Sequence, residues 1–304
     1  MKKVALVTDN SAYLTVEDQE KYGIVKLIPI SFIVNGEEYY ENVNMSYEQF
    51  YEYLADKKTD VSTSQPSIEM VKDGWREVLR DYDEIVYILL SSGLSAACNT
   101  ALNASHEEEF KGKVFVVNNQ RVSLLNKAAI IEANTMIKAG KSAREIKYYL
   151  EETKNDNGVY IAVDTLKFLK KGGRITPTAA AIGTLLNIKP ILQIHGGKLD
   201  SYAKTMSMKQ ARLKVYSAIR REVEERFPEE LKNGQVFLGI ANSYPDQKDP
   251  ELDVIRQEIR ENLSDMPLFS DEPLPLFIVC HTGPNALGIG YVVQRTGALL
   301  NDLK

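Results

Sequence analysis

The sequence predicts a two-domain α/β protein. Residues 1–158 are expected to form a doubly wound, mostly parallel sheet, and residues 159–304 are expected to form an α+β domain with a mixed or antiparallel sheet. The chain has 304 residues, which exceeds the usual domain size of about 100–200 residues. Short apolar runs alternate with helical patterns in the first half, and this alternation favours a parallel sheet covered by helices on both faces. After about residue 158 a hairpin and long charged helices replace the alternation.

Short apolar runs predict the strands of the first domain. These runs are residues 4–8, 24–34, 85–90 and 114–118. Asn35-Gly36 is a strong hairpin signal, so residues 37–40 are expected to return beside 24–34 at the sheet edge. Residues 61–67 are expected to form a polar loop before a helix. Capping boxes predict further helices that start after Ser46 and Ser142.

The second domain is expected to combine a hairpin with long helices. The predicted strands are residues 159–163, 189–194, 198–199, 236–241 and 276–279, and the predicted long helices are 207–226 and 250–263. Residues 276–279 are expected to be the last clear strand, with Cys280-His281-Thr282-Gly283 at its end.

Composition argues against several functional classes. The net charge of −5 and the pI of about 5.5 argue against a nucleic-acid partner. Cys98 and Cys280 form no C-x-x-C motif, so neither a disulfide framework nor a metal site is predicted. No apolar run approaches the roughly 20 residues of a membrane span, and the N-terminus lacks a signal-peptide pattern. We therefore expect a cytoplasmic protein without stable membrane insertion, metal or cofactor.

Three hydroxyl-rich loops follow predicted strands. They are residues 9–11, residues 62–67 with Thr63 and Ser64, and residues 91–95 with Ser91, Ser92 and Gly93. Ligands of open parallel sheets bind beyond the carboxyl ends of strands, and helix N-termini favour anions. A single Ser or Thr in such a place is commonly a helix cap. Three such loops together favour a carboxylate or phosphate ligand.

The second half supplies cationic and imidazole groups. Arg174 follows two lysines and two glycines, and its guanidinium could bind an anion with two parallel hydrogen bonds. His281 and Thr282 begin a loop that runs to Gly288. A neutral imidazole there could donate one hydrogen bond to an oxygen, although a histidine near a strand end is equally compatible with core packing.

A catalytic alternative also arises from the residues. Gly93, Ser95 and Ala97 approximate a G-x-S-x-G nucleophile elbow, and Ser95, Asp164 and His281 occur in the order of an esterase-like hydrolase. Ala97 stands where the second glycine is required, and no upstream H-G-G-G-like segment supplies an oxyanion hole.

The motifs in order resemble those of the DegV family. They are Val7-Thr8-Asp9, residues 63–67, residues 91–95, residues 169–175, Lys189-Pro190-Ile191-Leu192 and residues 281–288. Their order and spacing match the family pattern over nearly the whole chain. The resemblance implies a non-enzymatic carrier with a long-chain fatty acid in a tunnel between two domains. It also implies that a separate fatty acid kinase receives the acid and makes an acyl phosphate for phospholipid synthesis.

The resemblance also implies roles for individual residues. Thr63, Ser91 and Ser92 would hold the carboxylate from the first domain, with Ser64 beside them, and Gly93 would let backbone N–H groups approach. Arg174, His281 and Thr282 would approach from the second domain. The family usually has Gly-Thr-Tyr at residues 96–98, Asp-Ser near residues 118–120 and an arginine near Met206. This chain has Ala96-Ala97-Cys98 and Asn118-Asn119-Gln120, and the missing arginine concerns the surface that meets the kinase.

Overall fold

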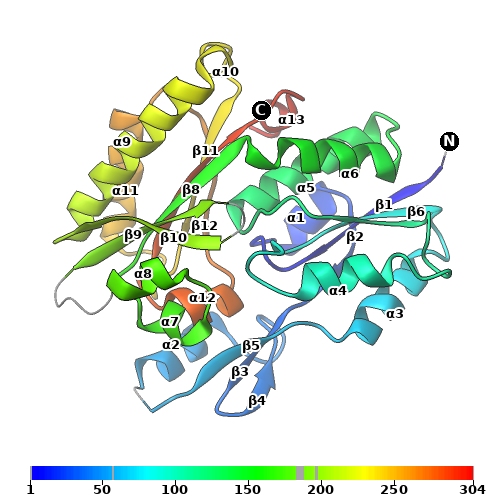
Figure 1. Cartoon of the computed structure of the whole chain (residues 1–304), viewed down its shortest axis with the longest axis horizontal. Helices are drawn as coiled ribbons and strands as arrows, with labels where there is room; N and C mark the ends of the chain where they lie inside the picture. The colour runs from blue at the N-terminus through cyan, green and yellow to red at the C-terminus, as the bar shows by residue number, and fades with distance from the viewer. Residues whose placement is uncertain (1, 57, 183–187, 196–197, 304) are drawn as a thin grey trace.

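The computed structural model describes residues 2–56, 58–182, 188–195 and 198–303. In this part of the chain the strands form sheets of four, six and three strands. The four-stranded sheet lies at the right of Figure 1, the six-stranded sheet at the left and the three-stranded sheet at the bottom. The three sheets meet near the centre of the molecule, where the candidate site lies.

The four-stranded sheet is parallel throughout and has the order β2-β1-β6-β7. Its strands are β1 (Val4–Asp9), β2 (Ile24–Ile28), β6 (Glu84–Ile88) and β7 (Val114–Val117). All residues of β1 and β6 are buried, as expected for strands covered on both faces. The predicted parallel sheet is therefore confirmed.

Helices cover both faces of this sheet, so the doubly wound prediction is also confirmed. Ala5 and Val7 of β1 pack with α3 (Ile68–Val78) and α4 (Ala97–Ala104). Leu6 points to the opposite face, because successive side chains of a strand alternate, and it packs with α5 (Leu124–Lys138) and α6 (Ala143–Glu152). A short helix, α1 (Val16–Lys21), precedes β2.

The six-stranded sheet has the order β10-β9-β8-β13-β11-β12. Its strands are β8 (Asn157–Ala162), β9 (Lys189–His195), β10 (Lys198–Thr205), β11 (Val236–Asn242), β12 (Leu268–Pro273) and β13 (Leu287–Val293). The pair β11–β12 is parallel and the other pairs are antiparallel, so the predicted mixed sheet is confirmed. Strands β12 and β13 were not predicted. Gly288 and Gly290 interrupt the apolar pattern that would have indicated β13, since glycine weakens a strand. The structure leaves little room for a side chain at position 290, because a Cβ there would lie 2.9 Å from the Gly158 carbonyl oxygen.

One face of the six-stranded sheet packs against long helices. Helices α9 (Met208–Arg226) and α11 (Pro250–Asn262) share a buried cluster with β11 and β13, and both lie at the left of Figure 1. Three short helical segments complete this half of the molecule: η1 (Thr153–Asn155), α10 (Pro228–Lys232) and α13 (Ala298–Asp302).

Helix α5 joins the two larger sheets. Its residues from Leu124 to Asn134 are all buried, and the helix contacts β1 and β6 on one side and β11 and β13 on the other. Because one continuous apolar cluster runs across this helix, the two halves of the chain share a core. The predicted domain boundary after residue 158 lies close to the start of β8 and stays a prediction.

The three-stranded sheet consists of β3 (Ser31–Val34), β4 (Glu37–Tyr39) and β5 (Val61–Ser64), and α2 (Tyr47–Ala55) packs beside it. The β3–β4 hairpin confirms the Asn-Gly signal. Its expected place at the edge of the main sheet is wrong, because the run 24–34 breaks at Pro29, which cannot donate to a ladder. The expected loop 61–67 is also partly wrong, because Val61–Ser64 pairs with β3.

The predicted strand at 276–279 is instead helix α12 (Leu276–Thr282). This helix is buried on nearly all sides, so its apolar run has no helical period, and a short continuous run does not distinguish a strand from a buried helix. Gly283, with φ of 74°, ends the helix. Helices α7 (Lys167–Gly172) and α8 (Pro177–Ile182) lie nearby, and α7 contacts α12 directly.

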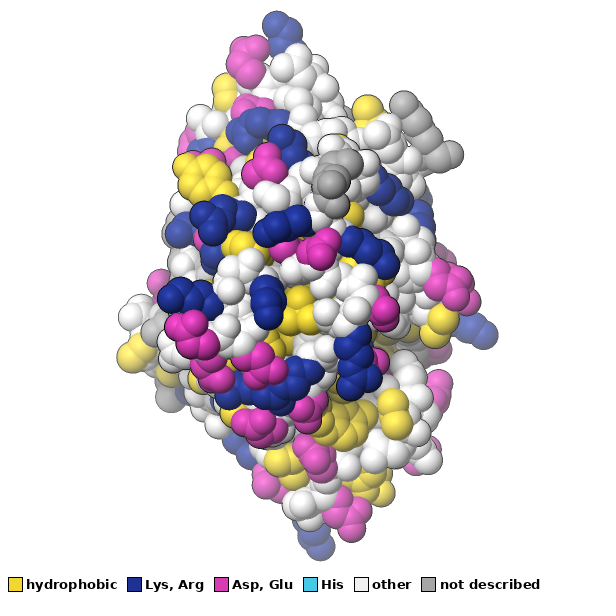
Figure 2. Space-filling model, turned by 90° about the vertical axis from the view of Figure 1, so that its right-hand side faces the viewer, with side chains coloured by type: hydrophobic (Ala, Val, Ile, Leu, Met, Phe, Trp, Pro, Cys, Tyr) yellow, Lys and Arg dark blue, Asp and Glu magenta, His cyan; other side chains and the backbone are white. Residues whose placement is uncertain are grey.

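The surface at the right of Figure 1 carries charges of both signs. Figure 2 shows Lys and Arg side chains interspersed with Asp and Glu across this face. Helix α3 lies on this side, and its Arg76 binds Glu109 at 2.8 Å and Asp73 at 2.8 Å. None of the helices in the described residues is long and apolar enough to cross a bilayer.

Both cysteines are free and buried. Cys98 lies in α4 and Cys280 in α12. Burial raises the pKa of each thiol to about 12, so both residues act as packing side chains.

Candidate functional site

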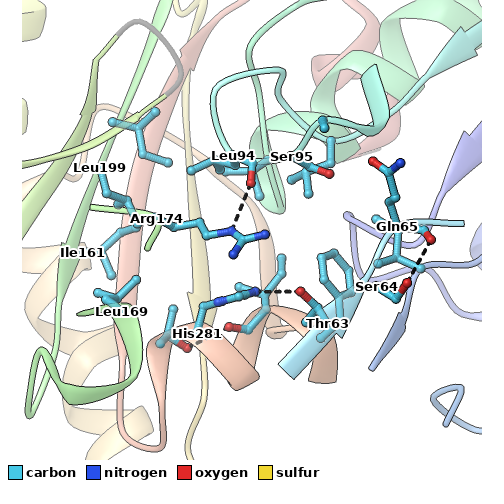
Figure 3. Close-up of a pocket in the computed structure, with 18 residues that line it drawn as sticks. Thr63, Ser64, Gln65, Leu94, Ser95, Ile161, Leu169, Arg174, Leu199 and His281 are labelled. Atoms are coloured by element: carbon cyan, nitrogen blue, oxygen red, sulfur yellow. Dashed lines mark hydrogen bonds between the residues drawn. The ribbon is translucent and has the colours of Figure 1, made fainter. Parts of the chain in front are cut away.

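A cavity of about 340 Å³ lies where the three sheets meet, within the usual range of ligand pockets of about 300–1,000 Å³. Its walls come from β5, α7, α12, β8, β9, β10 and the loop after β6 (Figure 3). Most of the lining is apolar. The apolar lining residues are Ile30, Leu90, Leu94, Ala96, Val122, Ile161, Leu169, Ile194, Leu199, Phe277 and Ile278.

The polar lining residues converge from both halves of the chain. They are Thr63, Ser64, Gln65, Ser95, Arg174, His281 and Thr282. Five of them, Thr63, Ser64, Arg174, His281 and Thr282, were predicted as site residues, and the structure brings these five together. Gln65 was not predicted, and Ser95 was predicted only as a nucleophile.

Thr63 and His281 form the direct link between β5 and α12. The Oγ1 atom of Thr63 lies 2.9 Å from Nε2 of His281. Burial, with a smaller contribution from the positive charge of Arg174, lowers the pKa of the imidazole to about 4. The ring is therefore neutral at pH 7. Its Nδ1 atom is buried and has no hydrogen-bond partner among the described residues.

Arg174 supplies the cationic group of the cavity, and no other Lys or Arg occurs among the described lining residues. Its Nε atom donates to the Leu94 carbonyl oxygen at 3.3 Å, and Nη1 donates to the Gly172 carbonyl oxygen. These two bonds hold the guanidinium beside His281, and Figure 3 shows it directed into the cavity. The positive charge and the neutral imidazole thus face the same space as the Thr63 hydroxyl.

The loop after β6 is placed differently from the expectation. Ser91 is buried, and its Oγ accepts a hydrogen bond from the Gly93 backbone N–H at 3.1 Å. Ser91, Ser92 and Gly93 do not occur among the lining residues, whereas Leu94 and Ser95 do. The role of the first three in binding stays a prediction.

The geometry gives no support to the hydrolase alternative. The His281 ring meets Thr63 through Nε2, while Ser95 Oγ accepts from the Ala97 backbone N–H at 3.2 Å. Asp164 binds the Lys189 ammonium at 2.8 Å and the Asn285 amide at 3.2 Å. The hydrogen bonds of these residues therefore provide no Ser-His-Asp relay.

A smaller cavity lies next to the apolar part of the first one. A second cavity of about 40 Å³ shares Val122, Ile161, Ile194, Ile278 and Thr282 with the first. Its other walls include Leu124 of α5, Val159 of β8 and Ala241 of β11. The two cavities are therefore neighbours, and the smaller one lies between α5 and the six-stranded sheet. The described residues contain no cluster of three or more His, Cys, Asp or Glu side chains suited to a metal ion.

A family model described as "Uncharacterised protein, DegV family" matches residues 3–294. The chain belongs to the DegV family. A DegV domain-containing protein of Deinococcus radiodurans is 30% identical over 288 residues, which cover 94% of this chain and 97% of the relative.

Solved structures of DegV proteins share the fold. A DegV family protein of Thermus thermophilus, described as binding fatty acid, has 28% identity and a TM-score of 0.83, with coverage of 96% of this chain and 99% of that one. The fatty-acid-binding DegV of Bacillus subtilis has 26% identity and a TM-score of 0.80, with coverage of 97% and 100%. These matches confirm the fold class that the sequence predicts.

Two departures from the DegV pattern lie at different distances from the cavity. Ala96 lines the cavity, whereas Ala97 and Cys98 are buried in α4. Met206 is 66% exposed and follows β10 directly. Ala96 is therefore part of the cavity wall, whereas Met206 lies at the outer surface.

A close contact between α7 and α12 leads to a prediction for this DegV protein. A Cβ at Gly172 would lie 2.1 Å from Nδ1 of His281. We expect Gly172→Ala to displace the imidazole and to break its hydrogen bond with Thr63, because the added methyl group cannot share the position of Nδ1. The ¹⁵N chemical shifts of the His281 ring measure this displacement, with Lys170→Ala on the exposed face of α7 as the control. Unchanged shifts in Gly172→Ala would show that the ring keeps its place.

Proposed function

We propose that this protein binds a long-chain fatty acid, with the carboxylate at Thr63, Arg174 and His281 and the acyl chain along the apolar part of the cavity. The observation that supports this most directly is the division of the cavity, which has a guanidinium, an imidazole and hydroxyls at one end and apolar walls elsewhere. Ser64 and Thr282 line the same polar end, and the loop of Ser91, Ser92 and Gly93 leads directly to Leu94 and Ser95 of the lining. Residues 1–158 and 159–304 supply opposite walls.

Both ends of such a ligand would be stabilised. Burial of each CH₂ group contributes about 0.8 kcal/mol, so a long acyl chain supplies most of the binding free energy. A guanidinium hydrogen-bonds a carboxylate more strongly than it bonds a neutral oxygen, so Arg174 favours an acid over an alcohol or ester. A neutral His281 can donate one hydrogen bond without adding a second buried charge. The DegV structures from Thermus thermophilus and Bacillus subtilis, described as fatty-acid-binding, support the same ligand class.

In this proposal the protein is a cytoplasmic carrier and not an enzyme, and it requires no cofactor. Chemistry on the carboxylate then requires a second protein, and we propose a separate fatty acid kinase that makes an acyl phosphate for phospholipid synthesis. Met206 in place of the usual arginine would change the contact with that kinase. Incubation of the loaded protein with such a kinase and ATP should yield acyl phosphate.

Extraction of the purified protein with organic solvent, followed by mass spectrometry, tests the proposal. We expect a long-chain fatty acid in near-stoichiometric amount, and delipidated protein should take up added palmitic acid. Failure to recover or rebind any acyl chain would refute the carrier function. If a fluorophosphonate probe also modified Ser95, the hydrolase would become the better explanation.

A further inference from the structure

One face of helix α12 forms a wall of the cavity. Phe277, Ile278, His281 and Thr282 all line it, and positions separated by four residues lie one above the other on a helix. The helix has only seven residues. A small shift or rotation of α12 would therefore move the His281 imidazole relative to Thr63.

The first turn of α12 is held by a distant carboxylate. The N-cap residue is Pro275, which makes no side-chain cap, and the first N–H groups of a helix have no partner inside the helix. Oε2 of Glu41 accepts the hydrogen bond of the Leu276 backbone N–H at 2.9 Å, across 235 positions of sequence. A negative charge at this end of a helix also interacts favourably with the helix dipole.

The loop between β4 and α2 holds Glu41 in place. The Tyr40 backbone N–H donates to Oδ1 of Asn44 at 2.7 Å, and the Asn42 N–H donates to the Met45 carbonyl oxygen at 3.0 Å. Asn42 has φ of 58°, a conformation that asparagine adopts more readily than most residues. Burial raises the pKa of Glu41 to about 7, so the carboxyl group is only partly ionised at neutral pH. Both the ionised and the protonated form keep an oxygen that can accept the Leu276 N–H bond.

The other end of α12 has its own anchor. Ser243 is fully buried, and its Oγ donates to the Gly283 carbonyl oxygen at 2.7 Å and accepts from the Ala286 N–H at 2.8 Å. The Ser243 carbonyl oxygen accepts from the Tyr51 hydroxyl at 2.9 Å. The last turn is fixed in this way. At the first turn, the Leu276 bond to Glu41 adds to the bond that the Leu274 N–H donates to the Asn242 carbonyl oxygen at 2.6 Å.

We propose that Glu41 is a positioning residue for the carboxylate end of the cavity, because it fixes α12 so that His281 stays within hydrogen-bond distance of Thr63. Glu41 is not among the residues that line this cavity, so it acts through the helix. This inference rests on the proposed function, since it assigns His281 to the carboxylate of the ligand.

The test compares two ligands that differ only in the head group. We expect Glu41→Ala to weaken the binding of palmitic acid by about tenfold, equivalent to about 1.4 kcal/mol, and to leave the affinity for 1-hexadecanol within about twofold. Glu41→Gln keeps an acceptor of the same length, so it should restore most of the affinity for the acid. Glu52→Ala, on the exposed side of α2, is the matched control and should bind both ligands normally.

A second measurement does not depend on the ligand. The ¹⁵N signals of the His281 imidazole in the delipidated protein should shift in Glu41→Ala and return toward the wild-type values in Glu41→Gln. If Glu41→Ala does not fold, Glu41→Asp shortens the side chain by one methylene and permits the same comparisons.

Two results would overturn the inference: an equal loss of affinity for acid and alcohol, or unchanged His281 signals in Glu41→Ala. If the wild-type protein binds no fatty acid, the proposed function fails, while the His281 signals still decide whether Glu41 positions the imidazole.

Discussion

Replacement of Arg174 by alanine is expected to weaken fatty-acid binding by about 100-fold, equivalent to about 2.7 kcal/mol, because a hydrogen bond to a charged group contributes about 1.5–3 kcal/mol. No other Lys or Arg lines the described cavity, so the ligand carboxylate would lose its counter-charge and remain partly desolvated. Affinity is measured by calorimetry with delipidated protein.

Three controls separate the charge from the packing of Arg174. Arg174→Lys keeps the charge but loses the forked geometry, so an intermediate loss is expected. Lys170→Ala removes an exposed charge four positions away and should bind normally. The affinity for 1-hexadecanol should change little in Arg174→Ala. If palmitic acid bound equally well to wild type and Arg174→Ala, its carboxylate would have to lie elsewhere.

Replacement of Arg121 by methionine is expected to lower the free energy of unfolding by about 3–5 kcal/mol, because removal of one partner leaves a buried charge uncompensated. Arg121 is fully buried, and its Nη1 lies 3.5 Å from Oε2 of Glu132, which is itself 1% exposed. Burial already raises the pKa of Glu132 despite the attraction of Arg121. Urea denaturation monitored by circular dichroism measures the change.

The matched control for this prediction is an ion pair at the surface. Arg295 binds Asp156 and Glu230 at 2.5 and 2.7 Å but is 41% exposed, so Arg295→Met should cost no more than about 1 kcal/mol. The double substitution Arg121→Met with Glu132→Leu should recover much of the stability, because it removes both buried charges. Comparable losses for Arg121→Met and Arg295→Met would contradict the assigned role of burial.

The sequence predicts the parallel sheet well because its strands are buried on both faces. Runs such as residues 85–90 have the length and the continuous apolar character of such strands. The same rule fails for α12, because this helix is buried on nearly all sides and its apolar run therefore shows no helical period. Strand β13 was missed for the opposite reason, since Gly288 and Gly290 interrupt its apolar pattern while permitting close backbone contacts.

The candidate site could be predicted only in part. Thr63, Arg174 and His281 were found because turn residues and family motifs mark them, and the structure places all three around one cavity. Ser91 lies outside the described lining of this cavity, and its Oγ accepts a bond from the Gly93 N–H; no spacing rule predicts this placement. The link from Glu41 to α12 joins residues far apart in the chain, so only the folded structure reveals it.

The buried cysteines have a practical consequence for kinetic work. A thiol with a pKa near 12 is ionised in about one molecule in 10⁴ at pH 8, and the thiolate is the reactive form. Cys98 and Cys280 should therefore remain unmodified by maleimides in the folded protein. A single cysteine introduced at Gln65, which lines the cavity, would then carry a polarity-sensitive fluorophore without background and would follow the uptake and release of a ligand in real time.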